Sequence, residues 1–543
     1  MKNIILTLSL IFTSLFLSAQ YASGVAVPDT SNEPITDTSD ISVMLANSIM
    51  SKDMRKHLTI LASDEYEGRE TGQKGNNMAA SYIANHFKSL NLPTIGEDNT
   101  YYQKVSFNRT GWTKNTVSIN GKEYKHLWDY LAFASLNESI PYLETEDLVY
   151  MGYGIDDPKY SDYKGKNVRG KVILINEGEP YNQDSISYVT GGREFSDWST
   201  DIYKKLRVAK TKGARMVLII SSNLTGFLGE NRRFLLNPRL ELGDGNFTTD
   251  FANHAYISTT MAKEIIGSKA KKVKRWRKKN IKKGKSKKLG LKSKVIMTFD
   301  KNIDVIRGNN VLGYIEGTDK KDEVVVISAH YDHLGKTGND IYNGADDNGS
   351  GTTTVLEMAQ AFALAKDMGV GPRRSVLCLL VTGEEKGLLG SEFYSENPLF
   401  SIENTVVNVN IDMVGRVDKK YENNPNYIYV IGSDRLSTDL HKINEDINQK
   451  YSHITMDYQY NSEKDPNRYY YRSDHYNFAR KGIPAIFFFN GTHEDYHRIT
   501  DTVDKINFDK MEKVGRHFFH TAWELANREE RIVVDGVVEE GGR

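Results

Sequence analysis

The sequence predicts an α/β fold in which a mostly parallel, mixed sheet carries helices on both faces. Three observations favour this fold class. The C-terminal half contains short, nearly continuous apolar runs, helical patterns separate these runs, and turn residues follow each run. Strands that are buried on both faces of a parallel sheet show such runs, and helices connect them. Functional sites in these sheets lie beyond the carboxyl ends of the strands.

The individual elements follow from the same patterns. A helix is predicted to end before Leu92-Pro93, because Met78, Tyr82, Ile83 and Phe87 lie on one helical face. The strands predicted in the C-terminal region are Glu323–Ala329, Ser375–Val381, Thr405–Ile411, Tyr427–Ile431 and Ala485–Phe489. The helices predicted there are Gly351–Lys366, Leu440–Tyr451 and Phe508–Asn527.

Residues 116–304 show a different pattern and are predicted to form a separate inserted module. A hairpin is expected around Asn120-Gly121, and two strands, Lys171–Asn176 and Ala214–Ser222, are separated by a crossover helix. The basic stretch Lys269–Lys294 is interpreted as a solvated helix and loop. The alternative, a polyanion-binding patch, is disfavoured because Trp276 is isolated and cannot form a series of stacked aromatic rings. Attachment to an anionic cell surface is the remaining possibility.

Length and charge restrict the class of protein. A chain of 543 residues is too long for one core, so two or three domains are expected. Lys+Arg and Asp+Glu both total 71, and this zero net charge argues against a nucleic-acid or membrane partner. The single cysteine, Cys378, lies within an apolar run and is expected to be a buried, inert thiol, so no intramolecular disulfide can form.

The N-terminus is typical of a secretory signal peptide. A basic start, Met1-Lys2-Asn3, precedes an apolar stretch that ends in small residues, and cleavage is expected near Ala19–Gln20. A retained anchor is the less favoured alternative, because the stretch is short and polar residues follow it. Residues 20–40 are predicted to be a flexible leader. The protein is therefore expected to be exported, periplasmic or secreted, without a transmembrane segment after cleavage; no pattern sets its oligomeric state.

Candidate metal ligands follow four of the predicted strands. The first strand delivers His330 and Asp332, and period-2 geometry places both on one face. A carboxylate there suits the role of holding the other ring nitrogen of a metal-bound imidazole, so Asp332 is interpreted as a supporting residue. The other candidates are Glu384, Glu385, Asp412, the pair Asp346 and Asp347, and His493, Glu494, Asp495, Tyr496 and His497.

Each of these residues alone is a weak signal, because a polar residue at a strand end is more often a structural hydrogen-bond partner. Their recurrence at successive strand ends of one sheet strengthens the signal. Imidazole and carboxylate ligands without cysteine suit zinc. Five protein ligands exceed what one catalytic tetrahedral ion can use, so two ions that share one carboxylate fit better. Of the adjacent residues Glu384 and Glu385, one could bind metal while the other transfers protons.

Six segments, in chain order, resemble the zinc exopeptidases of the aminopeptidase Y and aminopeptidase S type, a family that includes glutamate carboxypeptidase II and the transferrin receptor. They are SAHYDHLG, NGADDNGSG, VTGEEKGLLGS, NIDMVGR, SDHYNFARKGIPA and DYHRITDTVDKI. The resemblance covers residues 305–530, and LASDEYEGRETGQKG is similar to the N-terminal segment of the same domain, whose N-terminal part is expected to span residues 41–115. The segments VYMGYGI and VRGKVILI resemble a β-rich protease-associated (PA) domain within residues 116–304. Residues 531–543 would be a C-terminal tail.

The resemblance implies a role for each site residue. His330 would bind one zinc ion and His497 the other, and Asp347 would bridge both, with Asp346 as its non-ligating neighbour. Glu385 would complete the ligands of one ion and Asp412 those of the other.

The resemblance also implies residues that act without binding metal. Glu384 would be the general base and Tyr496 would help to hold the oxyanion, while Asp474 would support the site. It implies a cis peptide bond between Asp347 and Asn348. His333, His475 and His493 match no ligand of the family.

The expected function is that of an aminopeptidase with two Zn²⁺ ions per chain that acts on peptides. Another exopeptidase activity on this scaffold, a carboxypeptidase or a dipeptidase, is an alternative, since Arg416, Arg468 or Arg472 could bind a substrate carboxylate. A cyclotransferase of the glutaminyl cyclase type would use one zinc ion. A non-catalytic binding protein like the transferrin receptor would use none.

Overall fold

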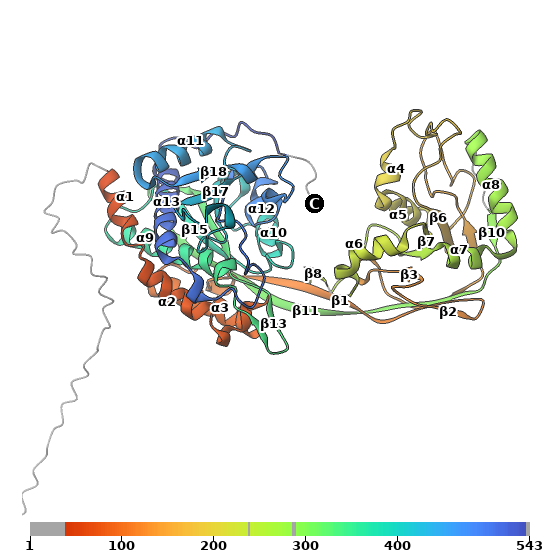
Figure 1. The fold of residues 1–543 in the computed structure, drawn as a ribbon, viewed down its shortest axis with the longest axis horizontal. Helices are drawn as coiled ribbons and strands as arrows, with labels where there is room; N and C mark the ends of the chain where they lie inside the picture. The colour runs from red at the N-terminus through yellow and green to blue at the C-terminus, as the bar shows by residue number, and fades with distance from the viewer. Residues whose placement is uncertain (1–37, 237–238, 285–288, 539–543) are drawn as a thin grey trace, which may run out of the picture.

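The computed structural model describes residues 38–236, 239–284 and 289–538. Figure 1 shows two lobes that are joined by a long ribbon of two strands. The predicted signal peptide and residues 20–37 of the predicted leader lie outside the described residues. The first helix, α1 (Thr38–Ala46), begins inside the segment predicted as leader. No helix within the described ranges is both long enough and apolar enough to span a bilayer.

The larger lobe is built on an eleven-stranded mixed sheet. In spatial order its strands are β18 (Thr455–Asp457), β17 (Tyr427–Ile431), β19 (Ala485–Phe489), β16 (Thr405–Ile411), β12 (Lys320–His330), β15 (Arg374–Val381), β11 (Val295–Ile315), β1 (Tyr102–Ile119) and β2 (Lys122–Tyr124), with β4 (Ile140–Thr145) and β8 (Arg239–Leu242) beside β11 and β1. The central strands β19, β16, β12 and β15 are parallel. β17 runs antiparallel to β19 but parallel to β18, and β11 runs antiparallel to β15 and β1.

Helices cover both faces of this sheet. One face carries α1, α2 (Ser51–Leu61), α3 (Lys74–Ser89), α9 (Gly351–Asp367), α11 (Thr438–Ile447) and α13 (Phe508–Asn527), and the other carries α10 (Leu389–Glu396) and α12 (His475–Ala479). Successive side chains of β12 point to opposite faces of the sheet. Ile327 therefore packs in the core on the first face, and Val326 packs in the core on the other face. The predicted fold class, a mostly parallel mixed sheet with helices on both faces, is confirmed.

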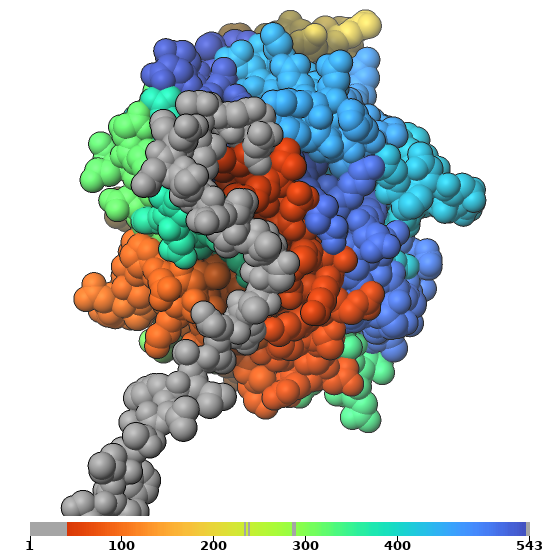
Figure 2. Space-filling view, turned by 90° about the vertical axis from the view of Figure 1, so that its left-hand side faces the viewer, coloured from red at the N-terminus to blue at the C-terminus, as the bar shows by residue number. Residues whose placement is uncertain are grey.

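The N-terminal helices pack against the last helix of the chain. Figure 2 shows this face, where the first described residues (red) lie beside the C-terminal ones (blue). The Ser51 backbone N–H donates to Glu512 Oε2 at 2.6 Å, and Arg516 Nε donates to the Ile49 carbonyl at 3.2 Å. Residues from the two ends of the larger lobe therefore share one core.

The smaller lobe has a sheet of its own. Its strands, in spatial order, are β10 (Leu289–Leu291), β5 (Leu148–Tyr150), β6 (Val172–Asn176), β7 (Met216–Ser221), β9 (His254–Ser258) and β3 (Tyr130–Leu131). Its helices are α4 (Asp197–Thr200), α5 (Ile202–Thr211), α6 (Leu224–Leu236), α7 (Thr259–Ile266) and α8 (Ala270–Lys283). The strands β5, β6, β7 and β9 are parallel, so this lobe contains more helix than the single crossover predicted from the sequence.

The strands β1 and β11 connect the lobes. They pair antiparallel from Tyr102 and Val311 to Ile119 and Val295, and β1 turns at Asn120-Gly121 into β2, the hairpin expected from the sequence. The predicted boundaries at residues 116 and 304 thus fall inside these strands. In α8, Trp276 is buried and packs edge-on against Tyr150 at 5.2 Å between ring centroids, so it is a core residue of the smaller lobe.

Candidate metal centre

The four central parallel strands of the larger sheet bring the predicted ligands to one edge. His330 is the last residue of β12, and Asp412 directly follows β16. Glu384 and Glu385 follow β15, and His497 lies in the loop after β19. Because the carboxyl ends of parallel strands meet at one edge, residues that are far apart in the sequence become neighbours there.

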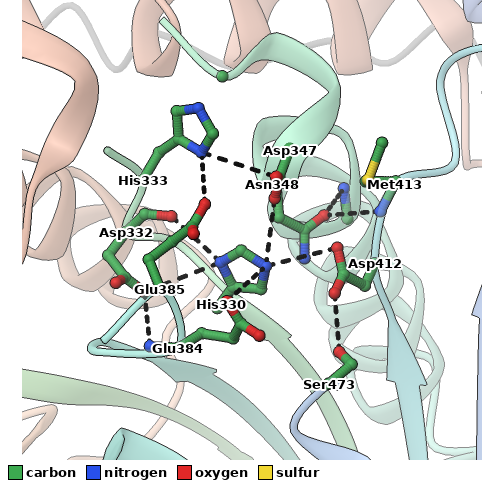
Figure 3. Close-up of polar contacts among 12 residues, drawn as sticks. His330, Asp332, His333, Asp347, Asn348, Glu384, Glu385, Asp412, Met413 and Ser473 are labelled. Atoms are coloured by element: carbon green, nitrogen blue, oxygen red, sulfur yellow. Dashed lines mark hydrogen bonds and ion pairs between the residues drawn. The ribbon is translucent and has the colours of Figure 1, made fainter. Parts of the chain in front are cut away.

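Asp347 lies beside His330 (Figure 3) and also contacts His497. Its Oδ1 is 3.5 Å from His330 Nε2, and its Oδ2 is 3.0 Å from His497 Nε2. Asp412 Oδ1 lies 3.4 Å from His330 Nε2, and Glu385 Oε2 lies 3.4 Å from His497 Nε2. The five predicted ligands therefore form two sets that share the carboxylate of Asp347.

These distances fit zinc. With zinc–ligand bonds of ~2.0–2.1 Å in a tetrahedral site, neighbouring ligand atoms lie about 3.3 Å apart. Asp347 and Asp412 are buried and the side chain of Glu385 is 6% exposed, and Asp412 Oδ1 and Glu385 Oε1 have no hydrogen-bond partner among the described residues. Buried carboxylates are costly unless cations or donors compensate them. The residues present are thus suited to hold two cations.

Asp346, the neighbour of Asp347, points into a different network. Its Oδ1 accepts the Gly415 N–H at 2.7 Å, and its Oδ2 lies 3.2 Å from both Asn490 Nδ2 and His493 Nε2. The peptide bond between Asp347 and Asn348 is cis, as expected from the resemblance. Asp347 faces the ligands, whereas Asp346 holds the surrounding loops.

Glu384 lies beside the first ligand set. Its Oε2 is 3.8 Å from His330 Nε2, and its backbone N–H donates to Asp332 Oδ1 at 3.2 Å. Burial, followed by the nearby carboxylates of Glu385 and Asp474, raises the pKa of Glu384 well above its ordinary value, although His330 opposes the shift. A carboxyl group with a raised pKa at such a position is suited to accept and release a proton.

Asp332 differs from the expectation. The backbone carbonyl of Asp332, at 3.1 Å, is closer to His330 Nδ1 than its carboxylate Oδ1, at 3.8 Å. The carboxylate instead accepts hydrogen bonds from Thr71 Oγ1 at 2.8 Å and from the Glu384 backbone. The strand ends at His330, so the alternation that placed both side chains together no longer applies at Asp332. Asp332 therefore positions the segment that carries Glu384.

Neighbouring histidines and carboxylates shift the pKa values of the predicted ligands. Burial lowers the pKa of His497, but its contacts with Asp347 and Glu385 outweigh burial and raise it to about 10. Burial also opposes the ionisation of Glu385, yet His333 and His497 hold its pKa well below the ordinary value. His330 follows the same rule, since the carboxylates around it overcome its burial and raise its pKa. A cation that bound here would replace these protons.

Tyr496 and Arg472 line the hollow beside the ligands. The Tyr496 ring stacks on His497 with centroids 3.9 Å apart, and its hydroxyl lies 3.4 Å from Arg472 Nη2. Burial and the carboxylates of Asp347 and Glu385 raise the pKa of Tyr496, so its hydroxyl stays protonated and can donate. Aromatic rings form another wall of the hollow: Tyr469, Phe487 and Phe489.

Asp474 lies just outside the two ligand sets. It is fully buried, accepts the Ser391 hydroxyl at 2.5 Å, and has a pKa that burial raises to about 7. The neighbouring Ser473 hydroxyl donates to Asp412 Oδ2 at 2.7 Å. The segment that contains both residues thus orients one predicted ligand.

Sequence reasoning missed Arg69, in the segment EGRETG. This fully buried side chain donates to four carbonyls, those of Tyr331 (2.9 Å), Leu61 (2.7 Å), Asn343 (2.7 Å) and Gly344 (2.8 Å). It therefore clamps the segment after His330 to the loop that leads to Asp347. The charge and glycines of EGRETG were the available signal, but no periodicity shows that they reach residues so distant in sequence.

Arg69→Lys is expected to destabilise the protein, because a lysine cannot satisfy four carbonyls arranged around a planar guanidinium. Each buried carbonyl left without a donor costs about 1–3 kcal/mol, so the thermal midpoint should fall by several degrees and metal binding should weaken. Thermal unfolding with and without zinc measures both effects. Arg109→Lys, at an exposed ion pair with Asp304, is the control and should change neither. Equal midpoints for the two variants would contradict the clamp.

Residues 310–522 match peptidase family M28. The M28 region contains all five predicted ligands, together with Glu384 and Tyr496, whereas Arg69 lies before it.

Curated relatives of the chain include peptidases of several kinds. It is 24% identical over 363 residues to a probable glutamate carboxypeptidase of Arabidopsis thaliana, covering 61% of this chain and 47% of the relative. It is 29% identical over 226 residues to leucine aminopeptidase 1 of Sclerotinia sclerotiorum (40% and 56%) and 26% identical over 219 residues to aminopeptidase YwaD of Bacillus subtilis (39% and 43%). The chain thus spans about half the length of these relatives.

A solved structure that resembles the chain is the aminopeptidase from Aneurinibacillus sp. strain AM-1. The two are 19% identical, with a TM-score of 0.49, over 91% of this chain and 98% of that one.

Proposed function

We propose that the protein is a metallo-aminopeptidase that binds two zinc ions and removes N-terminal residues from peptides. The observation that carries this proposal is the position of Asp347, whose two oxygens each face a different histidine. Each histidine has a further carboxylate beside it, and Glu384 lies next to the set that contains His330. A shared carboxylate is the usual arrangement in two-metal hydrolytic sites.

In the proposed reaction, zinc supplies Lewis acidity to the scissile carbonyl and to the attacking water when it is bound. His330, Asp412 and Asp347 would hold one ion, and His497, Glu385 and Asp347 the other. Glu384 would accept a proton from the water and deliver it to the leaving amine. The protonated hydroxyl of Tyr496 would donate a hydrogen bond to the oxygen that becomes negative as the water attacks.

The arginines near the site favour an aminopeptidase over a carboxypeptidase. Arg416 Nη2 lies 2.9 Å from Asp495 and 3.6 Å from Glu494, so its charge is already compensated. Arg468 packs over the Tyr471 ring at 4.7 Å. Among the described residues that line the hollow, Arg472 is the one lysine or arginine, so they form no cationic cluster for a substrate carboxylate.

Two further functions are less well supported. A cyclotransferase of the glutaminyl cyclase type uses one ion, yet the carboxylate between two histidines suits two. A non-catalytic binding protein does not require Glu384, whose raised pKa and position suit proton transfer. Metal content per chain distinguishes these functions, since about two ions are expected for the peptidase, about one for the cyclase and none for the binding protein.

The decisive experiment combines metal analysis with a substrate screen. Purified protein that has been equilibrated with zinc is expected to contain about two ions per chain and to cleave aminoacyl-p-nitroanilides. N-terminally blocked peptides should not be cleaved, because blocking removes the ammonium group, whereas C-terminally amidated peptides should be. Cleavage of the blocked peptides alone would show a carboxypeptidase instead. Cleavage of dipeptides but not of longer peptides would show a dipeptidase.

Two statements about the remainder of the chain also belong to the proposal. We propose that residues 1–19 direct export, so that the enzyme is periplasmic or secreted. We propose that residues 116–304 are a PA-like domain, with the peptidase domain formed by residues 41–115 and 305–530. The matching segment VYMGYGI begins on β5 and VRGKVILI ends on β6, and these strands are adjacent and parallel in the smaller sheet, which supports this division.

A further inference from the structure

His333 is a buried histidine beside the second ligand set, and the resemblance assigns it no role. It is 0% exposed, and neither ring nitrogen has a hydrogen-bond partner among the described residues. Buried polar groups almost always have a partner, and an exception requires an explanation such as an ion. Figure 3 shows the ring directed toward Glu385 and Asp347.

The contacts of His333 point to a cation. Its Nδ1 lies 2.8 Å from Glu385 Oε1 and 3.9 Å from Asp347 Oδ2. The first distance is that of an ion pair, but neither atom has a partner with hydrogen-bond geometry among the described residues. One atom from each of His333, Asp347 and Glu385 lies close enough to the others for all three to hold one ion.

The position of the ring is fixed by the backbone around it. The His333 backbone N–H donates to the Arg69 carbonyl at 3.3 Å, and the arginine side chain clamps the segments on either side. Gly344, with φ +54°, makes room for the ring, because a Cβ there would lie 2.4 Å from its Cδ2. The ring therefore cannot easily turn away from the carboxylates, and it is held where a ligand is needed.

We propose that His333 is an additional nitrogen ligand of the ion held by His497, Glu385 and Asp347. This inference rests on the proposed function, because it requires the two ions. It makes the ions unequal. The ion on the His497 side would then have four protein ligands, two imidazoles and two carboxylates, the number that a tetrahedral zinc site uses. His330, Asp412 and Asp347 would supply three ligands to the other ion, the number that catalytic zinc sites use when they leave a position for water.

Metal binding by two variants tests the proposal. His333→Ala removes the imidazole, whereas His333→Asn keeps an N–H donor near the position of Nδ1 but no imidazole ligand. In competition with a chromophoric chelator, both variants should bind one zinc ion as the unaltered protein does. The other ion should bind at least about 100-fold more weakly, beyond the roughly 10–100-fold loss typical of removing a hydrogen-bond partner of a ligand.

His517→Asn is the matched control. His517, on α13, is also fully buried, but its ring nitrogens form hydrogen bonds with Ser452 and Asn444. It should leave both zinc affinities unchanged. If His333→Asn restored what His333→Ala loses, His333 would be a hydrogen-bond donor to Glu385 and the proposal would be overturned.

X-ray absorption of the unaltered protein provides a test that does not depend on how a variant folds. Three histidines shared by two ions give about 1.5 imidazole ligands per zinc, whereas two histidines give about 1.0. A value near 1.0 with two ions bound would overturn the role of His333 alone. Failure of the unaltered protein to bind zinc would instead overturn the proposed function.

Discussion

Glu384→Gln is expected to lower kcat/KM by roughly 10²–10⁴-fold, the range typical of removing a general acid–base. Glutamine has the size of glutamate but cannot accept the proton of the attacking water. Glu384 lies 3.8 Å from His330 and outside the two ligand sets, so both ions should still bind. Hydrolysis of an aminoacyl-p-nitroanilide and metal content, measured on the same preparation, give the two values.

Glu422→Gln, at an exposed glutamate on the same lobe, is the control and should retain full activity. Normal turnover by Glu384→Gln would show that another group takes the proton. Loss of zinc from this variant would show that Glu384 is a ligand, and the roles of Glu384 and Glu385 would then have to be reassigned.

Asp347→Asn is expected to lose both ions and all measurable activity. The amide has one neutral oxygen in place of two anionic ones, so it cannot hold the two cations that Asp347 Oδ1 and Oδ2 would share. The metal content should fall below about one ion per chain, and zinc should no longer raise the thermal midpoint. Metal analysis and thermal unfolding with added zinc measure both outcomes.

The adjacent Asp346→Asn is the matched comparison. Asp346 accepts N–H groups from Gly415 and Asn490 and contacts His493, so this change should destabilise the loops yet leave two ions bound. If Asp346→Asn lost the ions while Asp347→Asn kept them, the wrong aspartate would have been identified as the shared ligand.

The sequence predicted the elements that set the site with good accuracy. The strands Thr405–Ile411, Tyr427–Ile431 and Ala485–Phe489 and the helix Phe508–Asn527 have the bounds that were predicted. These elements are buried on both faces or strongly amphipathic, so their apolar patterns are clear. Because the strands are parallel and adjacent, predicting their ends also predicted which polar residues would meet.

What the sequence did not predict depends on contacts after the strands end. His333 lies beyond β12, where the period-2 rule no longer applies, so its approach to Glu385 had no signal in the spacing. Arg69 donates to backbone carbonyls of residues far along the chain. Every residue has a backbone carbonyl, so the residue types in the sequence do not show which carbonyls Arg69 contacts. In the smaller lobe, the helices α4, α6 and α7 have no counterpart among the elements predicted from the sequence.

The pairing of β1 with β11 has a topological consequence. Ile119 and Val295 lie opposite each other at the far end of the ribbon, so everything between them is, in terms of chain path, the loop of a single β-hairpin. A tight two-residue turn could close the same hairpin. A domain attached in this way can be gained, lost or exchanged without rethreading the chain through the metal centre, and the two lobes are free to diverge at different rates.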